Sequence, residues 1–160
     1  MQKTKKSLLI QYLIIIMEIG CSIGFLAFLA DKEQIPLLIA PFGATAAMIY
    51  GVPNSQMAKI KNMLCGHLFS AAIGIFCYKF FGGSWYSVTL GLSLAVIFML
   101  ITNTMHPPGG ATAVLCIISR ADFSFLLLPL GLGLLVLTFI YYLGLWVQKI
   151  LQTTEQTKIS

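Results

Sequence analysis

The chain has 160 residues, of which 58% are hydrophobic and only 9% are charged, and its formal net charge is +5. Soluble globular domains contain about 25% charged residues, so this composition excludes an ordinary soluble domain. The mean hydropathy of +0.91 and a series of long uncharged stretches, each near or above about 20 residues, predict an integral membrane protein.

Basic residues lie at the ends of the apolar stretches and form no patch. Lys3, Lys5 and Lys6 precede the first stretch, as in a signal peptide, but this stretch is too long and lacks a small-residue cleavage site. We therefore expect it to be retained as a helix. The preference of basic residues for the cytoplasmic side of a membrane explains the net positive charge of the chain. We therefore do not interpret this charge as a nucleic-acid binding surface, and we expect no nucleic-acid partner.

Turn and helix-breaking residues divide the chain into six apolar segments. Four of them are expected to be full helices, at about Leu8–Ala30, Met57–Phe81, Trp85–Ile101 and Phe125–Leu151. The other two are short and broken, one beginning near Pro36 between the first two helices and one near His106 before the last helix. The sequence thus predicts an all-α membrane protein with a single transmembrane domain over residues 1–160.

The two broken segments are similar to each other when the sequence is shifted by 67 positions. The stretch Pro41-Phe42-Gly43-Ala44-Thr45-Ala46 then lies over Pro108-Gly109-Gly110-Ala111-Thr112-Ala113, with five of six residues identical. The flanking helices superimpose in the same order. We interpret the chain as two repeat units, about 8–81 and 85–151, each consisting of a helix, a broken half-helix and a second helix.

The distribution of basic residues bears on how the two units are oriented. With six crossings and a cytoplasmic N-terminus, seven basic residues lie inside and three outside. With four crossings and two re-entrant broken segments, the division is six against four. The positive-inside rule therefore favours two inverted repeats with both termini in the cytoplasm, and four spanning helices with two re-entrant segments are the alternative. We expect a multi-pass protein of the cell (plasma) membrane.

The second broken segment is too short to cross the bilayer as a helix alone. A helix from Gly109 to Ser119 would span about 16 Å at roughly 1.5 Å per residue, so part of the crossing must be extended chain. We expect both broken segments to become helical near Gly43 and Gly110. In inverted units the two half-helix N-termini would face each other near the midplane, each with partial positive charge and free N–H donors. Such an arrangement predicts an anion site.

The stretch Thr102-Asn103-Thr104-Met105-His106-Pro107-Pro108-Gly109-Gly110-Ala111-Thr112-Ala113 strongly resembles the HPP family of integral membrane proteins, named for its His-Pro-Pro triplet. Further stretches that resemble family motifs follow the family's order, namely Pro41–Thr45, Pro53 with Ser55, Asn62, and Gly66-His67. Plant and cyanobacterial members are associated with nitrite transport. The resemblance, which covers nearly all of the chain, therefore implies nitrite as the substrate.

The residues expected to bind the anion lie at the starts of the half-helices. They are Gly43, Ala44, Thr45, His106, Gly109, Gly110, Ala111 and Thr112. The glycines permit close backbone approach, the two threonines add hydroxyl donors at equivalent positions, and His106 can donate to an anion or carry a proton, since imidazole has a pKa near 6.5. The alternatives are helix packing through small residues and a capping role for His106.

Three further polar residues are candidates for a proton pathway or polar support. Glu18 is the one carboxylate well inside an apolar stretch, and a neutral, hydrogen-bonded Glu is the alternative to proton coupling. His67 has either a pathway role or a structural hydrogen bond to Asn62, Asn103 or broken backbone. Asn103 itself is either a site residue or a turn residue.

The sequence predicts transport of a small inorganic anion rather than catalysis. A passive anion channel, a membrane enzyme and a non-transporting partner subunit are the competing functions. We expect no enzyme activity, because no nucleophile is paired with a base. We also expect no metal or cofactor, because no metal-ligand spacing occurs. The expected partners are the anion, the lipid bilayer and further copies of the chain in a homo-oligomer.

Overall fold

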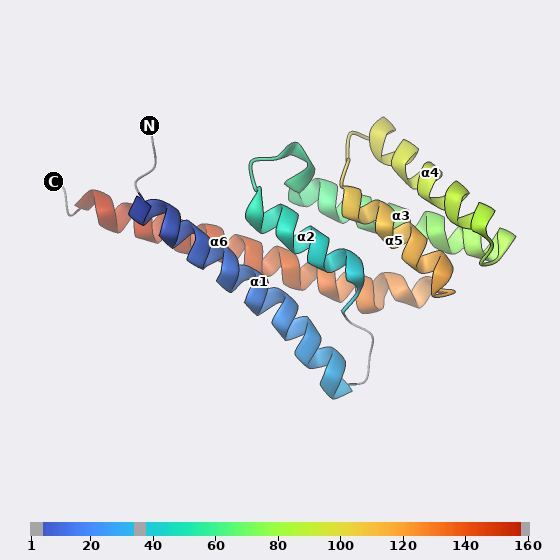
Figure 1. The fold of residues 1–160 in the computed structure, drawn as a ribbon, viewed down its shortest axis with the longest axis horizontal. Coiled ribbons are helices and arrows are strands. Elements are labelled where there is room, and N and C mark those ends of the chain that lie inside the picture. Colours follow the sequence, from blue (N-terminus) through green and yellow to red (C-terminus); the bar gives the residue numbers. More distant parts are fainter. Residues whose placement is uncertain (1–4, 34–37, 158–160) are drawn as a thin grey trace.

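The computed structural model of the protein describes residues 5–33 and 38–157, and within these residues all regular structure is helical (Figure 1). The α-helices are α1 (Lys5–Glu33), α2 (Ala40–Gly51), α3 (Ile60–Phe81), α4 (Trp85–Ile101), α5 (Pro107–Ile118) and α6 (Leu132–Thr157). The all-α fold predicted from the sequence is confirmed. Candidate spans that are long and apolar enough to cross a membrane are Leu8–Lys32, Ile60–Phe81 and Phe123–Leu151.

Two of the four long helices begin later than the sequence predicted. Helix α3 starts at Ile60, because Gln56–Ala58 forms a separate 3-10 turn. Helix α6 starts at Leu132, after a 3-10 turn over Phe123–Leu126 and a π-helical turn over Leu127–Gly131. Leu128 has an extended backbone (φ −132°, ψ 124°), as expected of a residue that precedes proline. The predicted helix Trp85–Ile101 has the same bounds as α4.

The two half-helices begin three residues earlier than predicted. Helix α2 starts at Ala40 rather than near Gly43, and α5 starts at Pro107 rather than near Gly110. The reason is that Pro41, Pro107 and Pro108 occupy the first helical turn. In that position the missing N–H removes no helical hydrogen bond and the fixed φ angle suits the helix.

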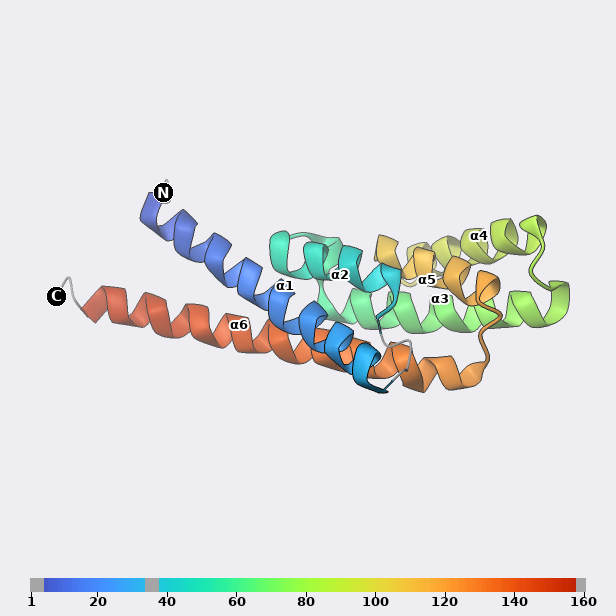
Figure 2. The ribbon, with the colours of Figure 1, turned by 60° about the horizontal axis from the view of Figure 1, so that its bottom comes forward.

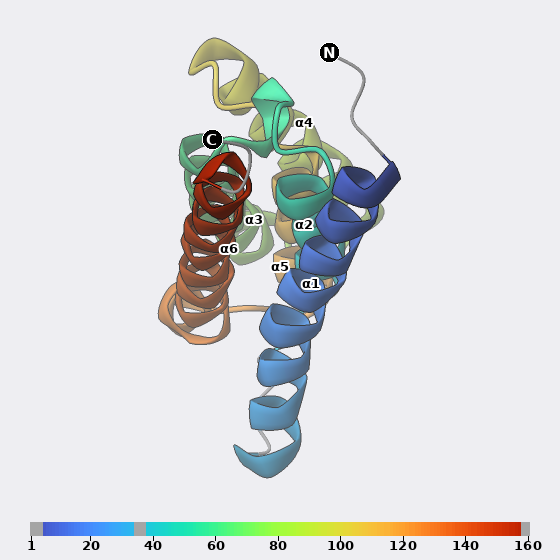
Figure 3. The same ribbon diagram turned by 90° about the vertical axis from the view of Figure 1, so that its left-hand side faces the viewer.

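Successive helices run in opposite directions along the long axis of the molecule. Figures 1 and 2 show α1, α3 and α5 running one way and α2, α4 and α6 running back. The start of α1 and the end of α6 therefore lie at the same end of the molecule, which faces the viewer in Figure 3. Because three of the described segments are long and apolar enough to cross a membrane by themselves, the six crossings stay a prediction.

The connection between α5 and α6 begins with a short polar stretch from Ser119 to Asp122, which precedes the apolar span Phe123–Leu151. The Asp122 carboxylate accepts hydrogen bonds from the hydroxyl of Ser124 and from its backbone N–H, at 2.9 Å for the latter. These hydrogen bonds lower the pKa of the exposed Asp122 side chain. Asp122 thus caps the 3-10 turn that leads into α6.

Helices α3, α4 and α5 form one closely packed group, and α1 and α6 pack more loosely against the other half-helix, α2 (Figures 1 and 2). Helix α5 approaches the backbone of α3 directly. A Cβ atom on Gly74 would lie 2.5 Å from the carbonyl oxygen of Ala113. The small residues at this crossing let the helices touch, as is common in membrane proteins.

Candidate functional site

The N-terminal halves of the two half-helices lie next to each other in the middle of the molecule. Helices α2 and α5 run in opposite directions with their N-terminal ends next to each other (Figures 1 and 2). Thr45 in α2 and Thr112 in α5, the two repeat-equivalent threonines, both contact the same side chain, His67 of α3. The two copies of the repeated motif are thus joined in the structure through one side chain, that of His67.

His67 bridges the two half-helices through both nitrogen atoms of its ring. Its Nε2 lies 2.7 Å from Thr45 Oγ1, and its Nδ1 lies 2.7 Å from Thr112 Oγ1. All three side chains have no exposed surface. Of the alternatives that the sequence left open for His67, a hydrogen bond to Asn62 or Asn103 is not formed, since both ring nitrogens contact threonines of the half-helices.

His106 is the N-cap residue of α5, but its ring does not cap the helix. Its Nδ1 donates to the Met57 carbonyl at 2.8 Å, and its Nε2 lies 3.2 Å from Thr45 Oγ1. The two imidazole rings are 5.1 Å apart between centroids. His106 is also fully buried. Both histidines are therefore enclosed between α2, α3, α5 and the 3-10 turn Gln56–Ala58.

The proton positions in this cluster follow from the partners. The Met57 carbonyl can only accept, so His106 Nδ1 carries a proton, and in the neutral ring Nε2 accepts from the Thr45 hydroxyl. Thr45 Oγ1 then accepts from His67 Nε2, and His67 Nδ1 accepts from the Thr112 hydroxyl. When both rings are neutral and the two hydroxyls donate to the imidazoles rather than to Pro41 O and Pro108 O, one continuous relay of donated hydrogen bonds runs from Thr112 to the Met57 carbonyl.

The facing helix ends offer fewer backbone donors than the sequence predicted. Pro41, Pro107 and Pro108 have no N–H, the Gly109 N–H donates to His106 O at 2.8 Å, and the Phe42 N–H donates to Ile39 O at 3.0 Å. The prolines that start the helices are the cause. The partial positive charge of the aligned peptide dipoles is unaffected, and the side-chain donors of the relay are the polar groups that meet between the helices.

The small residues predicted at the site fall into two groups. Gly43, Ala44 and Ala111 are exposed on the outer faces of the half-helices. Gly109 and Gly110 are buried, and a Cβ atom on Gly109 would lie 2.6 Å from the backbone carbon of Gly66. Gly109 therefore permits close contact of α5 with α3 beside His67.

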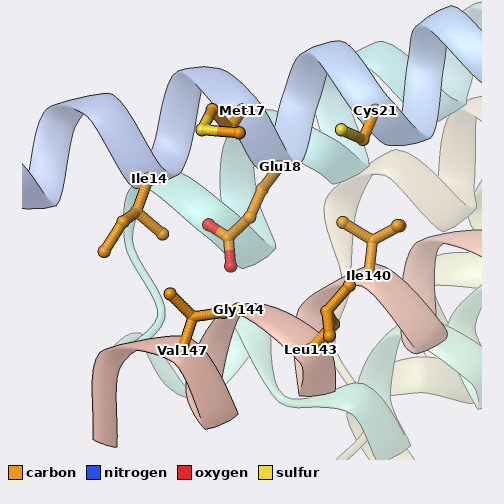
Figure 4. A pocket seen from close by; sticks show the side chains of 8 residues that line it. All are labelled: Ile14, Met17, Glu18, Cys21, Ile140, Leu143, Gly144 and Val147. Atoms are coloured by element: carbon orange, nitrogen blue, oxygen red, sulfur yellow. The ribbon is translucent and has the colours of Figure 1, made fainter. Parts of the chain in front are cut away.

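Glu18 lies in a separate pocket, away from the histidines. Its side chain is 7% exposed and points from α1 towards α6, with a carboxyl oxygen against Gly144 (Figure 4). The pocket has a volume of about 130 Å³, and the side chains that line it come from α1 and α6. Among the described residues the carboxyl group has no hydrogen-bond partner.

Asn103 does not join the site. It is exposed in the turn after α4 and has a positive φ angle of 52°, which asparagine tolerates better than most residues. Of its two predicted roles, the structure places it in that of a turn residue. The four cysteines are unpaired, and within the described ranges no group of three or more His, Cys, Asp or Glu side chains is arranged to hold a metal ion.

Two residues contribute to the site in ways that the sequence did not predict. Met57 acts through its backbone carbonyl, so its residue type says nothing about this role. Phe42 packs edge-on against His67 with ring centroids 6.0 Å apart. It lies inside the repeated motif but at the one position where the two copies differ, and that difference was the available signal.

The fold and the apolar helices define a multi-pass, all-α membrane protein. The family model described as HPP, transmembrane region matches residues 4–155, and the chain belongs to this family. The family resemblance noted in the sequence is thereby confirmed.

Two transmembrane proteins of Dictyostelium discoideum are similar in sequence. One is 36% identical over 116 residues, covering 68% of this chain and 41% of the relative. The other is 33% identical over 115 residues, covering 67% of this chain and 37% of the relative. The matched part of the chain thus spans about two fifths of the length of these relatives. No solved structure matches the chain.

Proposed function

We propose that this chain transports a small inorganic anion, with nitrite as the first candidate, across the membrane between its facing half-helices. The observation that carries the proposal is the meeting of the two half-helix N-termini at a buried pair of histidines. Both helix dipoles place partial positive charge there, and the imidazole and hydroxyl groups of the relay are the polar side chains that meet at this point.

The charge of the surrounding chain also favours an anion. Residues 34–121, which include α2, α3, α4 and α5, contain no Asp or Glu. A cation at the site would therefore meet two positive helix ends with no carboxylate nearby. The site has no Lys or Arg among its contacts either, which favours weak binding and fast release of a monovalent ion.

Nitrite is proposed because of the family, since plant and cyanobacterial HPP proteins are associated with nitrite transport. The two repeat units would be inverted, and the group α3–α5 would move against α1, α2 and α6 to open the site to either side. A passive channel with the same site is the alternative mechanism. A non-transporting partner subunit and a membrane enzyme are the competing functions of a different class.

Anion uptake into liposomes tests the proposal directly. Purified protein in liposomes is expected to take up nitrite with saturable kinetics, faster than nitrate or chloride and faster than empty liposomes. A His106→Ala variant is expected to slow this uptake at least about tenfold, because it removes a hydrogen-bond donor to a charged ligand. Folded protein that moves none of the three anions would refute anion transport and favour the partner-subunit function.

Labelling of single cysteines tests the proposed topology. In a variant whose four native cysteines are replaced by alanine, Ser119→Cys and Asn54→Cys are introduced separately. With six crossings and cytoplasmic termini in the plasma membrane, a membrane-impermeant maleimide added to intact cells is expected to label position 119 and to reach position 54 only after permeabilisation. Labelling of position 54 in intact cells would instead indicate re-entrant half-helices, whereas position 119 is outside in both arrangements and serves as the control.

A further inference from the structure

We propose that the His67–His106 pair takes up one proton together with each anion, so that the chain is an electroneutral proton–anion symporter. This inference rests on the proposed anion transport and names its second substrate. Two features of the cluster support it. Each threonine hydroxyl has a second hydrogen-bond acceptor, and no carboxylate among the described residues contacts the imidazoles.

Each threonine of the relay has a second acceptor within reach. Thr45 Oγ1 lies 3.0 Å from Pro41 O, and Thr112 Oγ1 lies 3.3 Å from Pro108 O. In the neutral relay the hydroxyl groups donate to the imidazoles. When a ring gains a proton, the adjacent hydroxyl can rotate, donate to the carbonyl of its own helix, and accept from the imidazole instead.

The cluster can therefore hold one additional proton without leaving a buried polar group unpaired. A proton on His67 turns Nδ1 into a donor to Thr112, whose hydroxyl then donates to Pro108 O. A proton on His106 has the same effect on Thr45 and Pro41 O. Because unpaired buried polar groups are costly, a site with partners for both states suits reversible protonation.

Among the residues that the structure describes, no carboxylate contacts the imidazoles to compensate the charge of that proton. Among the described residues, the titratable group in contact with each imidazole is the other imidazole. The contacts supplied by α2, α5 and the 3-10 turn are Phe42, Thr45, Thr112 and the Met57 carbonyl. The other titratable groups of α2, α3, α4 and α5 do not contact the imidazoles, and none is a carboxylate. They are Tyr50, Lys61, Cys65, Cys77, Tyr78, Lys79, Tyr86 and Cys116.

A buried positive charge between two positive helix ends is unfavourable unless an anion accompanies it. The anion in turn gains a cationic donor only when a ring is protonated. Each ligand therefore strengthens the binding of the other by the same factor, as linkage requires. Since proton and anion together carry no net charge, they can cross the apolar interior as a pair. The imidazole takes the proton from water, which breaks an O–H bond and forms an N–H bond, and the reverse step returns the proton to water where the anion leaves.

Simultaneous measurement of proton and nitrite flux tests the symport. Protein in liposomes containing a pH-sensitive dye is exposed to nitrite at an acidic external pH, with the membrane potential clamped by potassium and valinomycin. Because undissociated nitrous acid also crosses lipid, the relevant quantity is the initial rate above that of empty liposomes. We expect one proton to enter with each nitrite, and the rate to be independent of the membrane potential.

Variants identify the site of proton uptake. The double variant His67→Gln/His106→Gln keeps donor and acceptor groups but cannot hold the proton, so proton-coupled nitrite flux is expected to fall at least about tenfold. Glu18→Gln, in the separate pocket, is expected to keep the ratio of one proton per nitrite. An unchanged ratio in the double variant, or loss of coupling in Glu18→Gln alone, would overturn the assignment to the histidine pair.

A binding measurement on the wild-type protein does not depend on the folding of any variant. Nitrite raises the melting temperature of a protein that binds it, and its apparent affinity is expected to be at least about fivefold higher at pH 5 than at pH 8. Saturable nitrite transport that carries no proton and follows the membrane potential would overturn the symport and leave anion transport standing. The absence of any anion flux would instead refute anion transport itself.

Discussion

Replacement of His67 by leucine is expected to reduce nitrite uptake by at least about tenfold while the protein remains folded. The imidazole is the group that joins Thr45 and Thr112 across the meeting point of the half-helices. Without it the relay is broken in the middle, and the anion loses a charge-assisted donor that contributes about 1.5–3 kcal/mol.

The fold is expected to tolerate this change, because each threonine hydroxyl keeps the carbonyl of its own helix as an acceptor. We therefore expect a melting temperature in detergent within a few degrees of the wild-type value, measured by fluorescence-detected size-exclusion chromatography. Leu68→Ala, at the next and more exposed position of α3, is the matched control and should retain uptake. Normal uptake by folded His67→Leu protein would exclude the buried relay from the transport path.

Replacement of Gly74 by alanine is expected to destabilise the packing of α3 against α5. The added Cβ atom would lie 2.5 Å from the Ala113 carbonyl oxygen and 2.9 Å from its Cα atom. Both are backbone atoms that cannot rotate away, so the helices must separate. Overpacking of this kind costs about 1–3 kcal/mol, and the shift would also move Thr112 relative to His67.

The matched control for this prediction is Gly20→Ala in α1, where a Cβ atom would meet no atom within 4 Å. Alanine favours a helix by roughly 1 kcal/mol over glycine, so this variant should melt at or above the wild-type temperature. Gly74→Ala should melt clearly lower and show reduced nitrite uptake. Equal melting temperatures of the two variants would contradict the close approach of α3 and α5.

Local signals in the sequence were sufficient to predict most of the helical architecture. The apolar stretches and turn residues predicted six helices, and Trp85–Ile101 matched α4 in full. The prolines at 41, 107 and 108 indicated two short broken segments, although the helices begin at these prolines rather than after them. The reason is that a proline fits within the first turn of a helix, whereas it restricts only the backbone of the residue before it.

The sequence also pointed to the histidines and threonines of the site, but not to their contacts. The repeat paired Thr45 with Thr112, whereas the insertion of His67 between them joins residues 22 and 45 positions apart. The bond from His106 to the Met57 carbonyl spans 49 positions. Such contacts depend on which helix faces pack against each other. In a nearly uniformly apolar chain, the spacing of hydrophobic residues does not show which face of a helix is buried.

The amino-acid sequence by itself therefore determined the membrane environment, the six helices and the absence of acidic residues between positions 34 and 121, because composition and chain-local geometry decide these properties. Only the tertiary structure decided that His67 and His106 share a buried hydrogen-bond relay and that Glu18 lies apart from it. The physical reason is that α5 can reach the backbone of α3 at Gly66 and Gly74, and this close packing brings together groups that are distant in the chain.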